Sequence, residues 1–154
     1  MSHSYLHLLI DHQYWADQKL IEAILKLEKI PEKSKKLMNH IIAAQENWIA
    51  RIEGRVSKLS IWPEMETHDW NDWVNKNYEE LRLIGSDEQN MTKRVSYSNS
   101  TGKQFGNSIS EILLHLTMHS QYHRGQAITY ARDVFEIPPS TDMIVYLRTK
   151  SNEL

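Results

Sequence analysis

The sequence predicts an all-α protein, an up-down-up-down four-helix bundle with a small hairpin between its third and fourth helices and a short C-terminal helix. Apolar residues recur every three or four positions over four long stretches, as on the buried faces of helices. The connections between these stretches are modest in length, which favours a bundle. At 154 residues, with no internal repeat, the chain is expected to form a single domain over residues 1–154.

The first two predicted helices lie on either side of Pro31. The first begins near Ser4 and ends before Pro31, and His12 fills a gap in its apolar stripe. The stripe consists of Tyr5, Leu9, Ala16, Leu20, Ala23 and Leu27. The second helix begins near Ser34 and ends at Gly54, since glycine suits the left-handed end of a helix. Its apolar face consists of Leu37, Ile41, Ala44, Trp48 and Ile52.

A hairpin is expected between the third and fourth helices. Thr67 is predicted to cap the third helix, which ends at Gly85. This helix buries Trp70, Val74, Asn77, Leu81 and Ile84. The segment KRVSYSNSTGKQFG then predicts two short strands around a turn at residues 99–102. Ser108 and Glu111 match a capping box, so the fourth helix opens at Ser108 and is expected to run to about Phe135.

The last helix is expected to follow Pro138 and Pro139, because proline interrupts a helix. Ser140 is predicted to cap it. The helix itself includes Met143, Ile144, Leu147 and Arg148.

Composition excludes several partners. The net charge is -2 and the one basic run, KLEKIPEKSKK, contains glutamates, so no nucleic-acid partner is expected. No stretch reaches the roughly 18 to 20 apolar residues that span a bilayer, and the opening lacks a secretion signal. We therefore expect a cytoplasmic protein without a membrane partner. The chain has no cysteine, so any thiol chemistry requires sulfur from another molecule.

Three histidines stand four residues apart in the fourth helix: His115, His119 and His123. His119 and His123 continue the inward stripe, and Cβ atoms at this spacing lie about 5 to 6 Å apart, so two imidazoles can share one metal ion. A lone inward histidine such as His12 is more often a hydrogen-bonded core residue, but two neighbours both need partners where water is scarce. Spacing leaves the pair His115 and His119 open. The stripe assigns His115 to a supporting position or a helix interface.

A third ligand is expected from the second helix, because open metal sites usually have three protein ligands. His40 lies near the apolar face of that helix and can reach the ion if the second and fourth helices pack together. Imidazole suits several divalent metals, of which zinc or nickel is expected here. His3, His7 and His68 are interpreted as surface residues.

Four segments of the sequence resemble the DinB superfamily over nearly the whole chain. They are DHQYWADQKL, NHIIAAQENWIARI, the pattern HxxxHxxYHRGQ at 115–126, and PPSTDMIVYLR. The resemblance implies a four-helix bundle, often dimeric, with a divalent metal held by His40, His119 and His123. The superfamily includes enzymes that use low-molecular-weight thiols, among them bacillithiol and mycothiol transferases and a mycothiol-dependent maleylpyruvate isomerase. It also includes members without an established activity, so fold and metal transfer more safely than reaction.

The residues and the resemblance together predict a metal-dependent transferase that conjugates a small exogenous thiol to electrophilic small molecules in stress or detoxification. A homodimer is expected. Two alternatives stay open: a metal-dependent hydrolase, disfavoured because no HExxH motif is present, and a non-catalytic metal- or ligand-binding stress protein. In the second alternative, His12 or a carboxylate closes the metal site. No catalytic residue is predicted; the nearest candidates for a base are Glu46, Tyr122 and Arg148.

Three residues follow the last histidine of the pattern. Arg124 is expected to pair with a carboxylate of another helix, and Gln126 to support the site. Gly125 either permits the close approach of a neighbouring helix or is a tolerated defect, since glycine inside a helix costs roughly 1 kcal/mol relative to alanine.

Overall fold

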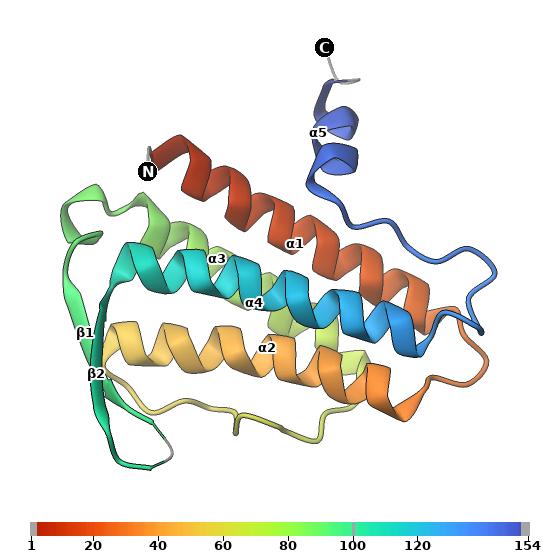
Figure 1. Ribbon diagram of the computed structural model, residues 1–154, viewed down its shortest axis with the longest axis horizontal. Helices are drawn as coiled ribbons and strands as arrows, with labels where there is room; N and C mark the ends of the chain where they lie inside the picture. The colour runs from red at the N-terminus through yellow and green to blue at the C-terminus, as the bar shows by residue number, and fades with distance from the viewer. Residues whose placement is uncertain (1–2, 100, 152–154) are drawn as a thin grey trace.

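Four long helices and a two-stranded sheet make up most of the protein, shown by a computed structural model that describes residues 3–99 and 101–151 (Figure 1). The long helices are α1 (His3–Leu25), α2 (Glu32–Glu53), α3 (Trp70–Ser86) and α4 (Ile109–Tyr130). The remaining elements are α5 (Met143–Ser151), the strands β1 (Arg94–Ser98) and β2 (Gln104–Ser108), and the 3₁₀ turns η1 (Thr67–Asp69) and η2 (Glu88–Asn90). Within the described ranges no helix is long and apolar enough to cross a membrane.

The helices do not alternate in direction as predicted. Trp70 of α3 donates to Asn39 of α2, and Asn77, further along α3, donates to Ile42, so these two helices run parallel. Figure 1 shows α1 and α4 running one way and α2 and α3 the other. The order is therefore up-down-down-up, and the up-down-up-down prediction is wrong.

The connection between α2 and α3 explains this order. Residues 54–66, here called the crossover, can span about 43 Å when extended. The 22 residues of α2 form a helix about 33 Å long. The crossover therefore returns along the whole of α2 before α3 begins (Figure 1). Side chains of α2 hold it in place, with Asn47 donating to the carbonyl of Leu59 at 3.0 Å and Asn39 to that of Pro63 at 3.2 Å.

The buried face of α1 is wider than the predicted stripe and rotated from it. Tyr5 is 63% exposed, whereas the neighbouring Leu6 is buried. Most contacts of α1 with the other long helices are with α3 and α4, so one narrow stripe cannot cover both neighbours. The buried apolar residues of α1 are Leu6, Ile10, Ala16, Leu20, Ile21 and Ile24.

Several predicted boundaries are confirmed. Gly54 ends α2 with φ 69°, in the left-handed region. Ser108 and Glu111 form the capping box of α4 with both hydrogen bonds present. The strands pair antiparallel as the predicted hairpin, with Arg94 opposite Ser108 and Ser98 opposite Gln104.

Three other boundaries differ from the predictions. Thr67 begins the 3₁₀ turn η1 and does not cap α3. α4 ends at Tyr130, before the predicted Phe135, and Phe135 packs against the core after a tighter turn. α5 begins at Met143, so Ser140 does not occupy its cap position. The preceding segment is fixed instead by the buried Thr141, whose carbonyl accepts a hydrogen bond from Nε2 of His12 at 2.8 Å.

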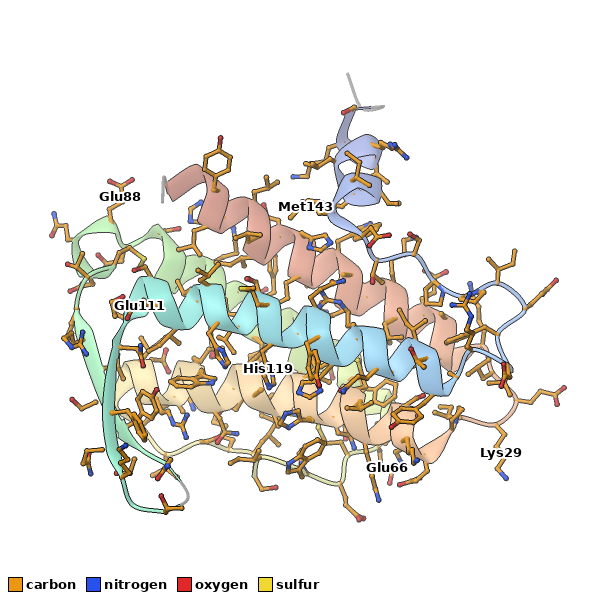
Figure 2. All side chains as sticks on the ribbon, viewed as in Figure 1. Lys29, Glu66, Glu88, Glu111, His119 and Met143 are labelled. Carbon is orange, nitrogen blue, oxygen red and sulfur yellow. The ribbon has the colours of Figure 1, made fainter. Side chains whose placement is uncertain are left out.

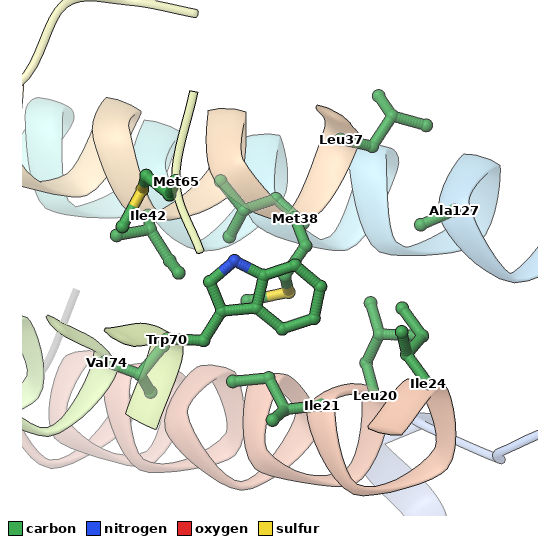
Figure 3. Close-up of a cluster of buried hydrophobic side chains, with 11 residues drawn as sticks. Leu20, Ile21, Ile24, Leu37, Met38, Ile42, Met65, Trp70, Val74 and Ala127 are labelled. Atoms are coloured by element: carbon green, nitrogen blue, oxygen red, sulfur yellow. The ribbon is translucent and has the colours of Figure 1, made fainter. Parts of the chain in front are cut away.

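Trp70 lies at the centre of one of two apolar clusters in the core. Figure 3 shows its indole ring between Ile21 of α1 and Met38 of α2. Its Nε1 donates to Oδ1 of Asn39 at 2.7 Å, so the buried donor is satisfied. The second cluster lies towards the hairpin and includes Leu6, Leu81 and Leu113.

A buried polar network joins the four long helices. Asp17 of α1 accepts hydrogen bonds from Arg124 of α4 at 2.8 Å and from Gln45 of α2 at 2.9 Å. Asn77 of α3 donates to Gln45 at 3.3 Å. Burial raises the pKa of the Asp17 carboxyl, while the charge of Arg124 opposes that rise. The predicted pairing of Arg124 with a carboxylate of another helix is confirmed.

Candidate metal centre

The antiparallel packing of α2 and α4 brings His40, His119 and His123 together. One ligand atom from each of the three lies within 4.8 Å of the others. The ring centre of His40 lies 5.1 Å from that of His119 and 4.7 Å from that of His123, and the latter two are 4.5 Å apart. Figure 2 shows His119 between α4 and α2. We call these three residues the histidine triad.

Two rings of the triad are held by hydrogen bonds on their Nδ1 atoms. Nδ1 of His40 lies 2.8 Å from the carbonyl oxygen of Ile61, and Nδ1 of His123 lies 2.7 Å from Oε1 of Gln126. Both oxygens only accept, so each Nδ1 carries the proton and each Nε2 keeps a lone pair for a metal. The expectation that Gln126 supports the site is consistent with this contact.

Burial favours the neutral, metal-binding form of His119 and His40. Burial and, to a smaller extent, the neighbouring histidines together lower the pKa of His119 to about 4. The pKa of His40 is also lowered, mainly by burial, although donation to Ile61 opposes the shift. Nδ1 of His119 is buried and has no hydrogen-bond partner among the described residues. A divalent ion therefore fits this set of three imidazoles.

Two exposed aromatic side chains border the triad. Trp62, on the crossover, stacks on His40 with ring centres 3.8 Å apart and planes inclined by 10°, yet it is 58% exposed. Tyr122 is 63% exposed, and its ring centre lies 5.0 Å from that of His123. The triad thus lies close to the surface. The sequence singled out neither Ile61 nor Trp62 as part of a site, because they lie on a connection without periodicity.

The other histidines lie outside the triad. The ring centre of His115 lies 5.3 Å from that of His119 and 5.6 Å from that of Trp48. This position agrees with the assignment of His115 to a supporting position or a helix interface. His12 is a buried, hydrogen-bonded residue, as its ordinary interpretation predicted. His68 is exposed and His7 only partly buried, while the side chain of His3 lies outside the described part of the structure.

Two of the three candidate bases, Glu46 and Arg148, are unsuitable. The carboxylate of Glu46 is buried and accepts two hydrogen bonds from Arg55, at 2.7 and 3.1 Å. These contacts and the nearby Lys76 outweigh burial and lower the pKa of Glu46, so it is a poor proton acceptor. Arg148 lies on α5 and is exposed. Only Tyr122 lies beside the triad.

Gly125 does not permit a close helix contact. A Cβ atom built at this position meets nothing within 4 Å, and the residue is exposed. The alternative interpretation, a tolerated helix defect, therefore holds.

Comparison with the sequence profiles of protein families identifies the family of this chain. The profile of the DinB family matches residues 1–154. The chain belongs to the DinB family. Among curated proteins, none matches this DinB protein closely enough to count as a relative. The triad consists of the residues at which the resemblance places the metal, and the structure shows that they can hold one.

Proposed function

We propose that this DinB protein is a metal-dependent transferase that conjugates a small exogenous thiol to an electrophilic small molecule. The observation that carries the proposal is a near-surface triad of imidazoles. Among the described side chains, those of residues 5–99 and 101–151, no carboxylate or fourth histidine completes the cluster. Family membership supports the same reading. Since the chain has no cysteine, the sulfur belongs to a separate molecule.

The triad would hold a divalent ion, zinc or nickel, which supplies the positive charge that lowers the pKa of a bound thiol. Ile61 and Gln126 keep the Nδ1 protons of His40 and His123 in place. Trp62 covers one face of the His40 ring and limits its rotation. In the overall reaction a sulfur–carbon bond forms while the bond from carbon to the leaving group breaks. The leaving group departs with its electron pair, and the thiol proton passes to solvent.

The test compares thiol conjugation by zinc- or nickel-loaded protein and two histidine variants. A panel of small thiols is offered with 1-chloro-2,4-dinitrobenzene, and product formation is followed by absorbance. His123→Ala should lose at least about 100-fold in kcat/KM, since it removes a ligand and its loss exceeds that of a supporting residue. His68→Ala, at an exposed histidine of η1 outside the triad, is the matched control and should retain activity. Thiol-dependent conjugation that survives in His123→Ala would contradict the proposal.

The same samples separate the alternatives. Turnover of an ester or amide without added thiol would identify a hydrolase. Stoichiometric metal with no turnover of either kind would favour the non-catalytic metal-binding protein. Elemental analysis of untagged protein identifies the metal, and light scattering during size-exclusion chromatography tests the proposed homodimer. Cell fractionation tests the proposed cytoplasmic location.

A further inference from the structure

A row of ring side chains leads from the triad along α2 and α4 to the hairpin. The ring centres of His119 and His115 lie 5.3 Å apart, and those of His115 and Trp48 lie 5.6 Å apart. The ring centre of Trp48 lies 4.8 Å from that of Tyr97 of β1. Two ring contacts therefore separate Trp48 from the triad, a span on the order of 10 Å, or the extended length of about three residues.

Arg51 lies at the far end of this row. Its guanidinium carbon is 4.5 Å from the ring centre of Trp48 and 5.2 Å from that of Tyr97, so the cation stacks on two aromatic faces. These contacts orient the side chain without using its N–H donors.

Arg51 has no carboxylate partner among the described side chains, those of residues 5–99 and 101–151. Three other arginines have carboxylate partners: Arg55 pairs with Glu46, Arg82 with Asp11 and Arg124 with Asp17. The Arg51 side chain forms no ion pair and no hydrogen bond with the residues that the structure describes. An oriented cation with free donors matches the two oxygens of a carboxylate or phosphate.

We propose that Trp48, Arg51 and Tyr97 form a binding site for an oxyanion, a carboxylate or phosphate carried by the small thiol. We call these three residues the anion seat. The distance between the seat and the triad suits a molecule of tripeptide size, whose thiol reaches the triad while its anionic end contacts Arg51. This inference rests on the proposed function and names the class of thiol: anionic, and longer than a few atoms.

The experiment uses glutathione and its diethyl ester as probes, because they share a thiol and a length but differ in two carboxylates. Calorimetry measures the affinity of zinc-loaded protein for each. Glutathione should bind about 10-fold more tightly than the diester, as expected for a charge-assisted hydrogen bond. Arg51→Gln should abolish this preference, and Arg51→Lys should keep part of it. Arg148→Gln, with the same change of charge on α5, is the matched control and should behave like the parent.

A second readout does not depend on the metal. The indole N–H signal of Trp48, assigned with Trp48→Phe, should shift in NMR spectra when glutathione is added and remain fixed in Arg51→Gln. Inorganic phosphate identifies which oxyanion the seat accepts: a phosphate-induced shift points to phosphate, and its absence beside a glutathione response points to carboxylate. Zinc content and melting temperature of each variant must match the parent, and Arg51→Lys decides the question if Arg51→Gln does not fold.

The two readouts fail separately. A glutathione preference that persists in Arg51→Gln, or a Trp48 signal that no oxyanion moves, overturns the anion seat even if both thiols bind. If glutathione still shifts the Trp48 signal through Arg51 but the zinc-loaded protein conjugates no thiol, the seat stands and the metal-dependent function fails.

Discussion

At the scale of single residues, the triad depends on atoms outside its own set of metal ligands. Gln126 fixes the proton of His123 on Nδ1 and thereby directs Nε2 towards the other rings. We expect Gln126→Ala to lower zinc affinity about 10-fold, at the lower end of the effect of supporting residues. Competition with a chromogenic chelator measures the affinity. Gln104→Ala, on the hairpin, is the control, and an affinity equal to the parent's would show that Gln126 does not orient the ring.

His119 predicts a pH dependence of stability in the metal-free protein. The unfolded chain takes up a proton on this residue below about pH 6.5, whereas burial lowers the folded pKa to about 4. The contribution is therefore fully present above pH 6.5 and is lost as the pH falls towards 4. Allowing for partial exposure of the ring, we expect a loss of about 2 kcal/mol.

Urea unfolding between pH 7 and pH 4.5 measures this loss in the parent and in His119→Leu. For each protein, the free energy of unfolding is plotted against pH. The difference between the two slopes gives the contribution of His119, because the two proteins share the other titrating groups. Equal slopes would show that His119 has the same pKa in the folded and unfolded chains.

The residue scale also shows how far the site could be predicted. His119 and His123 follow from spacing on one helix, and His40 from a face that packs against it. Gln126 is expected to support the site because it closely follows the last histidine of the pattern. Ile61 and Trp62 approach the triad only through the path of the crossover, which no local pattern describes. The role of Gly125 was open, since sequence does not show which neighbours surround a residue.

At the scale of elements, helices and hairpin were predictable because their signals are local. The capping box at Ser108 and the left-handed Gly54 involve residues at most a few positions apart. Helix direction is not local. A connection of the length of residues 54–66 can either turn back or cross the bundle, and tertiary contacts of Asn39 and Asn47 with its carbonyls decide the outcome.

Two glycines give opposite predictions at this scale. Gly54→Ala should lower stability by about 1 kcal/mol, because φ 69° strains any residue with a Cβ atom even though the site is open. Gly125→Ala should raise stability by about 0.5 to 1 kcal/mol, because it lies inside an exposed helix with nothing within 4 Å of the added atom. Urea denaturation of both variants tests the pair. A destabilised Gly125→Ala protein would reveal a constraint on α4 beyond this open surface.

At the scale of the whole molecule, buried polar contacts accompany the up-down-down-up arrangement. Asp17, Gln45, Asn77 and Arg124 come from four different helices and meet in the interior. Such groups require partners, so an arrangement that separates them would leave buried charges or amides unsatisfied. The sequence predicts that Arg124 pairs with a carboxylate of another helix. It does not identify Asp17 as that carboxylate, because the two residues lie far apart along the chain. The single domain predicted over residues 1–154 stays a prediction.

Variants of Asp17 and Arg124 measure how much their buried ion pair contributes to the stability of the fold. Arg124→Met should destabilise the metal-free protein by about 3 to 5 kcal/mol, because it leaves the Asp17 carboxylate buried without its cation. Replacing both, as Asp17→Leu with Arg124→Met, should recover a large part of that loss, since an apolar pair has no charge to desolvate.

A double-mutant cycle by urea unfolding gives the interaction energy between Asp17 and Arg124. Zinc binding to the double variant reports whether α2 and α4 still hold the triad together. If the losses of the two single variants simply add, the ion pair is not energetically coupled. If the double variant is stable and binds zinc, apolar packing is sufficient to maintain the arrangement of these helices, and the buried charges are not required for it.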